Sequence, residues 1–264
     1  MDLLIPVLVI GGLGLFFGLV LAFAANIFAV RQDEKIDKIE EVLPGANCGA
    51  CGYAGCSAYA NAIVKDGAKV NCCSVGKDKV AEQIAEIMGV QAEKSAPKVA
   101  HVRCRGTCEN TTAKYEYVGV RDCIAASKLA GGQKHCRNAC LGMGTCIKVC
   151  PFDAISIVDG VAVVDEELCV GCGTCSAICP HHVIEIIPKN VKTKVNCSNT
   201  EKGQSANRHC KASCIGCKMC ERVCEFDAIH VEGNIASIDY MKCTACGKCA
   251  EKCPKKVITF EEKN

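Results

Sequence analysis

The sequence predicts an α+β protein in which an N-terminal helix precedes several small domains, and three observations lead to this fold class. The segment from Leu3 to Val30 contains no charged residue. The chain carries 26 cysteines in 264 residues, most of them in short, regularly spaced runs. In its second half, cysteines recur at a constant offset of 74 residues, as in Cys136 and Cys210 or Cys123 and Cys197, which indicates duplication of one unit.

The uncharged segment predicts a transmembrane anchor over residues 1–30. At about 1.5 Å rise per residue, such a helix exceeds the ~30 Å thickness of the hydrocarbon layer. A cleaved signal peptide is the alternative, because Ala22-Phe23-Ala24 looks like a cleavage site, but no Lys or Arg precedes the apolar run. Arg31, Lys35 and Lys38 follow it, so the positive-inside rule places the rest of the chain on the cytoplasmic side of a bacterial cytoplasmic membrane, after a single span.

Residues 31–92 are expected to form a small helical domain around four cysteines. A polar helix ends before Pro44-Gly45, a second helix starts near Ser57, and Val80 begins an apolar helical face that covers the site. Glycines between the cysteines let the backbone pass close to a bound group. The expected ligands are Cys48, Cys51, Cys56 and Cys73, with Cys72 an alternative to Cys73.

The remaining chain is expected to contain a linker with extra cysteines (93–122) and two modules (123–190 and 191–264). Each module contains a C-x2-C-x2-C-x3-C-P run, one ending at Cys179-Pro180 and the other at Cys253-Pro254. This is the spacing with which bacterial ferredoxins hold [4Fe–4S] clusters: three thiolates wrap one cluster and the fourth ligates its neighbour. Two tandem bacterial-type ferredoxin modules, each with two [4Fe–4S] clusters, are therefore predicted.

Each module is also expected to contain a β-hairpin between its cysteine runs. Alternating apolar residues flank Asp159-Gly160 in the first module and Gly233-Asn234 in the second. Such dipeptides between short apolar runs are typical of tight hairpin turns.

The arrangement in which the fourth cysteine of each run ligates the neighbouring cluster, here called the crossover rule, assigns the ligands of four clusters. The first run of module 1 departs from the pattern, because Met143 stands where module 2 has Cys217, and Cys136 is taken as the missing ligand. With the helical domain, five clusters are predicted; a sixth could use Cys104, Cys108 and Cys123, whereas Cys72, Cys197 and Cys210 are left over. The four module sets are Cys136/Cys140/Cys146/Cys179, Cys150/Cys169/Cys172/Cys175, Cys214/Cys217/Cys220/Cys253 and Cys224/Cys243/Cys246/Cys249.

Other uses of the cysteines fit this pattern less well. Disulfide scaffolds suit short secreted chains, and they do not need a repeated Cys-Pro ending. Zinc binds Cys-x2-Cys pairs but closes with four ligands of its own. A net charge of +2 without a basic block argues against nucleic acid, and no motif predicts a catalytic residue or a direct NAD site on this chain.

The order of anchor, Asn47-Cys-Gly-Ala-Cys-Gly-Tyr-Ala-Gly-Cys56 motif and ferredoxin modules resembles the B subunits of Rnf electron-transport complexes over essentially the whole chain. The sequence departs from the family at Cys73-Ser-Val-Gly-Lys77, where a Pro-Gly-Gly is usual after one intervening residue. The resemblance implies a component of an ion-translocating ferredoxin:NAD+ oxidoreductase, an enzyme complex, with other membrane and peripheral subunits as partners and soluble ferredoxin as electron donor. The alternatives are an anchored polyferredoxin that supplies another redox enzyme and a zinc-binding assembly scaffold.

Overall fold

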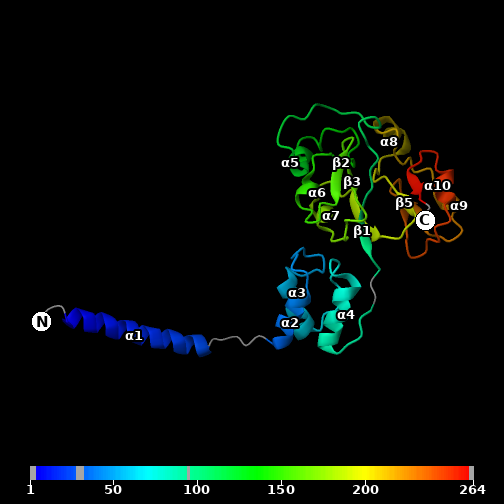
Figure 1. Cartoon of the computed structure of the whole chain (residues 1–264). Helices are drawn as coiled ribbons and strands as arrows, with labels where there is room; N and C mark the ends of the chain where they lie inside the picture. Colours follow the sequence, from blue (N-terminus) through cyan, green and yellow to red (C-terminus); the bar gives the residue numbers. More distant parts are fainter. Residues whose placement is uncertain (1–3, 28–32, 94–95, 262–264) are drawn as a thin grey trace.

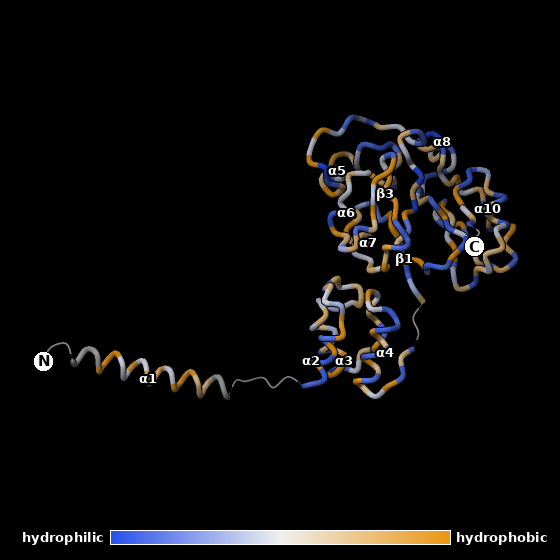
Figure 2. The backbone as a smooth tube through the Cα atoms, viewed as in Figure 1, coloured by the Kyte–Doolittle hydropathy of each residue, from blue (hydrophilic) through white to orange (hydrophobic). Residues whose placement is uncertain are grey.

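The computed structural model describes residues 4–27, 33–93 and 96–261. Figure 1 shows three parts in chain order: an extended N-terminal helix, a small helical domain, and two α+β modules packed side by side. The hydropathy colouring of Figure 2 shows apolar residues inside each domain and along the N-terminal helix.

The N-terminal helix α1 spans Leu4–Ile27, inside the segment for which a transmembrane anchor is predicted. Its large apolar side chains between Leu8 and Phe23 are exposed. The predicted span itself is not supported: in the part of the chain that the structure describes, no helix combines the length and the apolar character that crossing a membrane requires.

The helical domain consists of three helices around one apolar core. Asp33 caps the first helix by accepting a hydrogen bond from the Lys35 amide, and the other two end at glycines with left-handed backbone conformation. Tyr59 and the isoleucines Ile39 and Ile84 are almost completely buried between the helices. The elements are α2 (Glu34–Val42), α3 (Cys56–Asp66) and α4 (Lys77–Met88).

Module 1 is built on two antiparallel strand pairs. The predicted hairpin is confirmed, with Ile155 opposite Val164 and the turn at Asp159-Gly160. A second pair joins β1 (Lys98–Val102) to β4 (Ile184–Pro188), which lies more than 80 residues later along the chain. The elements are β1 (Lys98–Val102), α5 (Cys123–Lys128), α6 (Thr145–Lys148), β2 (Ile155–Val158), β3 (Val161–Val164), α7 (Thr174–Ile178) and β4 (Ile184–Pro188).

Module 2 repeats this arrangement. Its predicted hairpin is also confirmed, with Ile229 opposite Ile238. The strand β5 (Thr193–Val195) pairs with β8 (Ile258–Phe260) as β1 does with β4. The elements are β5 (Thr193–Val195), α8 (Gly203–His209), α9 (Met219–Val223), β6 (Ile229–Glu232), β7 (Ile235–Ile238), α10 (Lys248–Lys252) and β8 (Ile258–Phe260).

The segment 93–122 is more than the linker that the sequence predicts. Residues 98–102 are the strand β1, an integral part of module 1. The local sequence pattern does not predict this strand, because the strand is short and its partner is distant in sequence. It also changes the alignment of the repeat: the strand that precedes Cys197 in module 2 corresponds to the strand that precedes Cys104 in module 1, so Cys104, not Cys123, is the structural counterpart of Cys197.

Candidate cluster-binding sites

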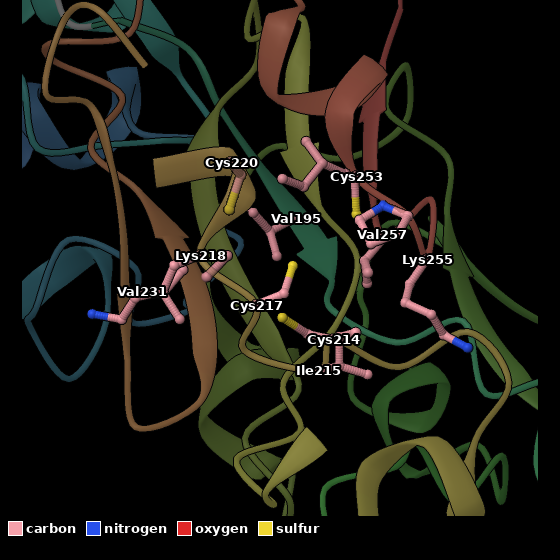
Figure 3. A pocket seen from close by; sticks show the side chains of 13 residues that line it. Val195, Cys214, Ile215, Cys217, Lys218, Cys220, Val231, Cys253, Lys255 and Val257 are labelled. Atoms are coloured by element: carbon pink, nitrogen blue, oxygen red, sulfur yellow. The ribbon is translucent and has the colours of Figure 1, made fainter. Parts of the chain in front are cut away.

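The first site of module 2 is a small cavity with four cysteines in its wall. Cys214, Cys217 and Cys220 come from the first cysteine run, and Cys253 comes from the end of α10. Figure 3 shows these side chains around one space, together with Val195 and other apolar residues. The structure therefore brings together all four thiols that the crossover rule assigns to this site.

The second site of module 2 has the reciprocal composition. Cys243, Cys246 and Cys249 line a cavity with Cys224, which lies at the C-terminal end of α9. The cysteines at both helix ends, Cys224 and Cys253, have extended backbone conformation, so each chain segment turns away from its own run toward the other site.

In module 1, one site has the predicted cysteines and the other also has cysteines outside its predicted set. Cys175 has Cys172, Cys169 and Cys150 as its electrostatic neighbours, which is the set that the sequence predicts. Cys146 has Cys140 and Cys179 near it, as predicted, and also Cys123 and Cys175, of which Cys175 belongs to the set of the other site.

Cys123 is held at this site by the start of helix α5. Its backbone N–H donates to the Thr145 hydroxyl at 2.6 Å, and that hydroxyl donates to the Asp122 carboxylate at 2.9 Å. Asp122 also caps α5 by accepting from the Ala125 amide, and these hydrogen bonds lower the pKa of its carboxyl group. The structure thus supplies a thiol where Met143 removes one from the first run. The sequence shows that Met143 stands in a ligand position, but which cysteine replaces the missing thiol depends on the fold.

Cys136 does not join the set that the sequence assigns to it. Its thiol is buried, and the neighbouring thiols that act on it electrostatically are Cys104, Cys197 and Cys210. The sequence favours Cys136 because it lies only four residues before Cys140, but its neighbours Cys197 and Cys210 place it at the boundary between the two modules.

In the helical domain, the structure favours Cys73 over Cys72. The thiol of Cys73 has Cys56 and Cys48 as electrostatic neighbours and accepts a hydrogen bond from the Gly76 amide at 3.3 Å. The backbone amide of Cys72 instead donates to the Tyr59 hydroxyl. Cys51 packs against the same apolar core as Cys56, Cys72 and Cys73.

The loop that carries these cysteines is fixed by Asn47. Its side-chain oxygen accepts from the Cys56 amide at 2.8 Å, and its side-chain nitrogen donates to the Gly45 carbonyl. Asn47 itself has a positive φ of 46°, a conformation that asparagine tolerates better than most residues. This arrangement anchors the first ligand loop to the start of α3.

The thiols have the chemistry of cluster ligands. Burial raises the pKa of Cys146, Cys175 and Cys220 to about 12, so the free side chains are neutral and a cation must displace their protons. All 26 cysteines are free thiols in the structure. Within the described residues, no three His, Cys, Asp or Glu side chains gather closely enough to hold a single metal ion.

A [4Fe–4S] cluster fits these sites better than a single ion does. It places an iron at each of four corners, so its thiolates stand around a cage rather than around one point. The cavities in module 2 are walled by four sulfurs and by apolar side chains. Backbone N–H groups point at several sulfurs, as for Ala162 and Cys140 at 3.4 Å and for Ala228 and Cys224 at 3.4 Å.

Comparison with known proteins supports the same chemistry. Three family profiles match the chain: "Putative Fe-S cluster" over residues 43–75, "4Fe-4S binding domain" over 162–185 and "4Fe-4S dicluster domain" over 213–257. The helical domain and both modules therefore contain segments typical of iron–sulfur proteins, and the chain binds [4Fe–4S] clusters.

Several curated proteins are similar to nearly the whole chain. The B subunit of the Na(+)-translocating ferredoxin:NAD(+) oxidoreductase complex of Acetobacterium woodii is 46% identical over 97% of this chain and 78% of its own length. The B subunit of the ion-translocating oxidoreductase complex of Methanosarcina acetivorans is 45% identical over 95% of both chains. The proton-translocating counterpart of Clostridium ljungdahlii is 43% identical over 98% of this chain and 93% of its own length.

Proposed function

The chain belongs to the B subunits of ion-translocating ferredoxin:NAD+ oxidoreductase complexes, and from this premise we propose that it takes electrons from reduced ferredoxin and relays them to its partners in the complex. It is the iron–sulfur electron-transfer component of such a complex, which is an oxidoreductase and translocase. When bound, each [4Fe–4S] cluster accepts and releases one electron.

Five clusters in three domains form the proposed relay. Four of the five ligand sets are the ones predicted from the sequence: that of the helical domain, that of the second site of module 1 and those of both sites of module 2. The set for the first site of module 1 becomes Cys123, Cys140, Cys146 and Cys179, because Cys123 and not Cys136 lies beside Cys146. The protein contributes the spacing of the clusters and the N–H groups and apolar walls that set their potentials.

We place the acceptance of electrons at module 2. Among the proposed ligands, all of which lie in the described chain, Cys246 is the one with an exposed side chain. Phe226 lines the same site and Met241 lies close to it in sequence, and both side chains are exposed. A reduced ferredoxin could approach this site closely, whereas buried sites would add distance to the transfer.

The helical domain is the proposed exit. A cavity lies between its ligand loop, with Cys51 and Ser74, and the second site of module 1, with Cys169 and Val170. Electrons that reach module 1 therefore have a short route to Cys48, Cys51, Cys56 and Cys73. The exit side would face the other components of the complex, with the cluster domains in the reducing cytoplasm at a bacterial membrane.

The observation that carries this proposal is the grouping of thiols into separate four-cysteine sites across all three domains. The test uses the full complex, purified without oxygen, with Cys48→Ala in this chain and Cys72→Ser as the matched control. Cys48→Ala should lower ferredoxin-dependent NAD+ reduction by about tenfold or more, as loss of metal-site residues generally does, and Cys72→Ser should not. Unchanged activity in Cys48→Ala would contradict the exit through the helical domain. A colourless protein that contains zinc and little iron would contradict the relay as a whole.

A further inference from the structure

Four cysteines outside these sites occupy matching positions in the two modules. Cys104 follows β1 in the segment Val-Arg-Cys-Arg-Gly-Thr, and Cys197 follows β5 in the segment Val-Asn-Cys-Ser-Asn-Thr. Cys136 and Cys210 each follow a histidine and lie four residues before Cys140 and Cys214, the first cysteines of the first run in each module. Each module thus contributes one cysteine after its first strand and one before its first cysteine run.

Contacts between the modules bring the four positions together. The Arg103 side chain donates to the Cys197 carbonyl at 3.2 Å, and the Ser198 hydroxyl donates to the Asn138 carbonyl at 2.9 Å. These bonds join the surroundings of Cys104 and Cys136 to those of Cys197.

The fourth cysteine, Cys210, is joined to module 1 in a similar way. Thr111 forms an isolated β-bridge with Cys210, and its hydroxyl donates to the His209 carbonyl at 2.8 Å. The rings of His135 and His209 stack with centroids 5.7 Å apart. Cys136 and Cys210 therefore lie on either side of this contact.

Three of these thiols are buried, Cys104 is partly buried, and the four lie close to one another. Cys136 is 6% exposed, Cys197 7% and Cys210 6%. The neighbours that act electrostatically on Cys136 are Cys104, Cys197 and Cys210, and Cys104 also acts on Cys197 and on Cys210. Four thiols from two modules thus lie near one another at the boundary between the modules.

Backbone donors surround these sulfurs as they do the sulfurs of the other sites. The Cys104 sulfur accepts from the Gly106 and Cys140 amides, both at 3.3 Å. The Cys197 sulfur accepts from the Asn199 amide at 3.4 Å and from the Cys214 amide at 3.3 Å. Backbone N–H groups that point at a sulfur are also the donors found around the sulfurs of bound iron–sulfur clusters.

A buried positive charge lies beside the same group. Lys134 is 7% exposed, and its ammonium donates to the carbonyls of Gly106 at 2.6 Å and Gly160 at 2.8 Å. These two carbonyls are its partners, and no ion pair joins it to a carboxylate of the described residues, although a buried ammonium is costly without a negative partner. Lys134 acts electrostatically on Cys210 and Cys140, so a cluster with four thiolates would supply the missing negative charge.

We propose that Cys104, Cys136, Cys197 and Cys210 hold a further [4Fe–4S] cluster that connects the two modules. The inference extends the relay proposed above and rests on it. Cys140 and Cys214, whose amides donate to Cys104 and Cys197, are themselves ligands of the first site in module 1 and in module 2. The bridging site is therefore one hydrogen bond from a ligand of each neighbouring cluster. Relay through it moves one electron in and one electron out, and no bond is made or broken.

Cluster counting on the full chain, purified without oxygen, tests this proposal. Native mass spectrometry of the unaltered protein should show six clusters, and chemical analysis about 24 irons with an equal amount of acid-labile sulfide, at four irons per cluster. Five clusters and about 20 irons in the unaltered protein would overturn the bridging site while leaving the relay of five clusters intact. Little iron of any kind would instead mean that the proposed function fails.

Substitutions identify the ligands. Cys136→Ser and Cys210→Ser, one in each module, should each remove about four irons and leave the other five clusters in place. Cys108→Ser is the matched control, because Cys108 is exposed in the same region, and it should keep every cluster. An unchanged cluster count in both ligand variants would refute the assignment. If a variant loses several clusters because it unfolds, the count on the unaltered protein still decides.

Discussion

At the scale of single residues, the most informative position is Met143. It occupies the place of a ligand, and the thioether is a poor substitute for a thiolate in an iron–sulfur site. Cys123 compensates from a different element, because the Thr145 hydroxyl and the Asp122 cap fix the start of α5 beside Cys146. In the proposed relay, the two modules thus reach the same number of ligands by different routes.

This compensation can be tested by exchange. Cys123→Ser should remove about four irons per chain, because the first site of module 1 keeps only three thiolates. Adding Met143→Cys to that variant should restore them, since it recreates the Cys-x2-Cys-x2-Cys run of module 2. Iron and sulfide analysis with electron paramagnetic resonance of the reduced protein would measure both effects. Full iron content in Cys123→Ser alone would show that Cys123 is not a ligand.

At the scale of elements, the loop before α6 depends on close contact with the β2–β3 hairpin. A Cβ at Gly142 would lie 2.5 Å from the carbonyl oxygen of Gly160, which is part of the hairpin turn. Gly142 also has a φ of +69°. A glycine is therefore required twice over, for its backbone conformation and for the approach of the hairpin backbone.

Two alanine variants separate these requirements. Gly131 has a φ of +73° and open space around a Cβ, so Gly131→Ala should cost about 1 kcal/mol of stability through backbone strain alone. Gly142→Ala should cost about 1–3 kcal/mol more, because the hairpin or the ligand loop must shift, and it should weaken cluster retention in module 1. Thermal unfolding without oxygen and iron content after heating are the measurements. Equal losses in the two variants would show that the clash is relieved without cost.

Some parts of this fold can be predicted from the sequence and others cannot. Both hairpins were predictable, because a strand, a two-residue turn and its partner lie within about ten residues and the turn residues are distinctive. The β1–β4 and β5–β8 pairs were not, because short strands such as Thr193–Val195 carry little pattern and their partners are far along the chain. The regular Cys-x2-Cys runs were equally readable, whereas the surroundings of Cys104, Cys123 and Cys136 depend on those distant pairings.

At the scale of the whole molecule, the two modules are joined by hydrogen bonds between arginine side chains and backbone carbonyls. The Arg103 guanidinium donates to the carbonyls of Cys197 and Ala236 in module 2, and also to the Glu185 carboxylate in module 1. Burial raises the pKa of Glu185, and the charge of Arg103 opposes that rise. Arg105 makes a more exposed contact, to the carbonyl of Lys256. Relative placement of the modules therefore depends on the partly buried Arg103 more than on the exposed Arg105.

Replacing these arginines should separate their contributions. Arg103→Met should lower stability by about 2–3 kcal/mol, because it leaves a half-buried carboxylate and two carbonyls without their donor, and it should slow electron transfer between the modules. Arg105→Met, which removes one exposed contact, should cost less than about 1 kcal/mol. Denaturant unfolding without oxygen and rapid-mixing reduction by ferredoxin would measure the two effects.

The Arg103 variant should also show a pH dependence of known sign. Without Arg103, the pKa of Glu185 is expected to rise further above its value in the unfolded chain, so the native state binds more protons than the unfolded state between those two values. Stability then falls as the pH rises through this range, and part of the loss should be recovered in mildly acidic buffer, where the carboxyl group is protonated. The double variant with Glu185→Gln should lose this dependence, since no carboxyl group remains. A loss in Arg103→Met that does not vary with pH would instead mean that the two carbonyls, and not the carboxylate, account for the contribution of Arg103 to the pairing of the modules.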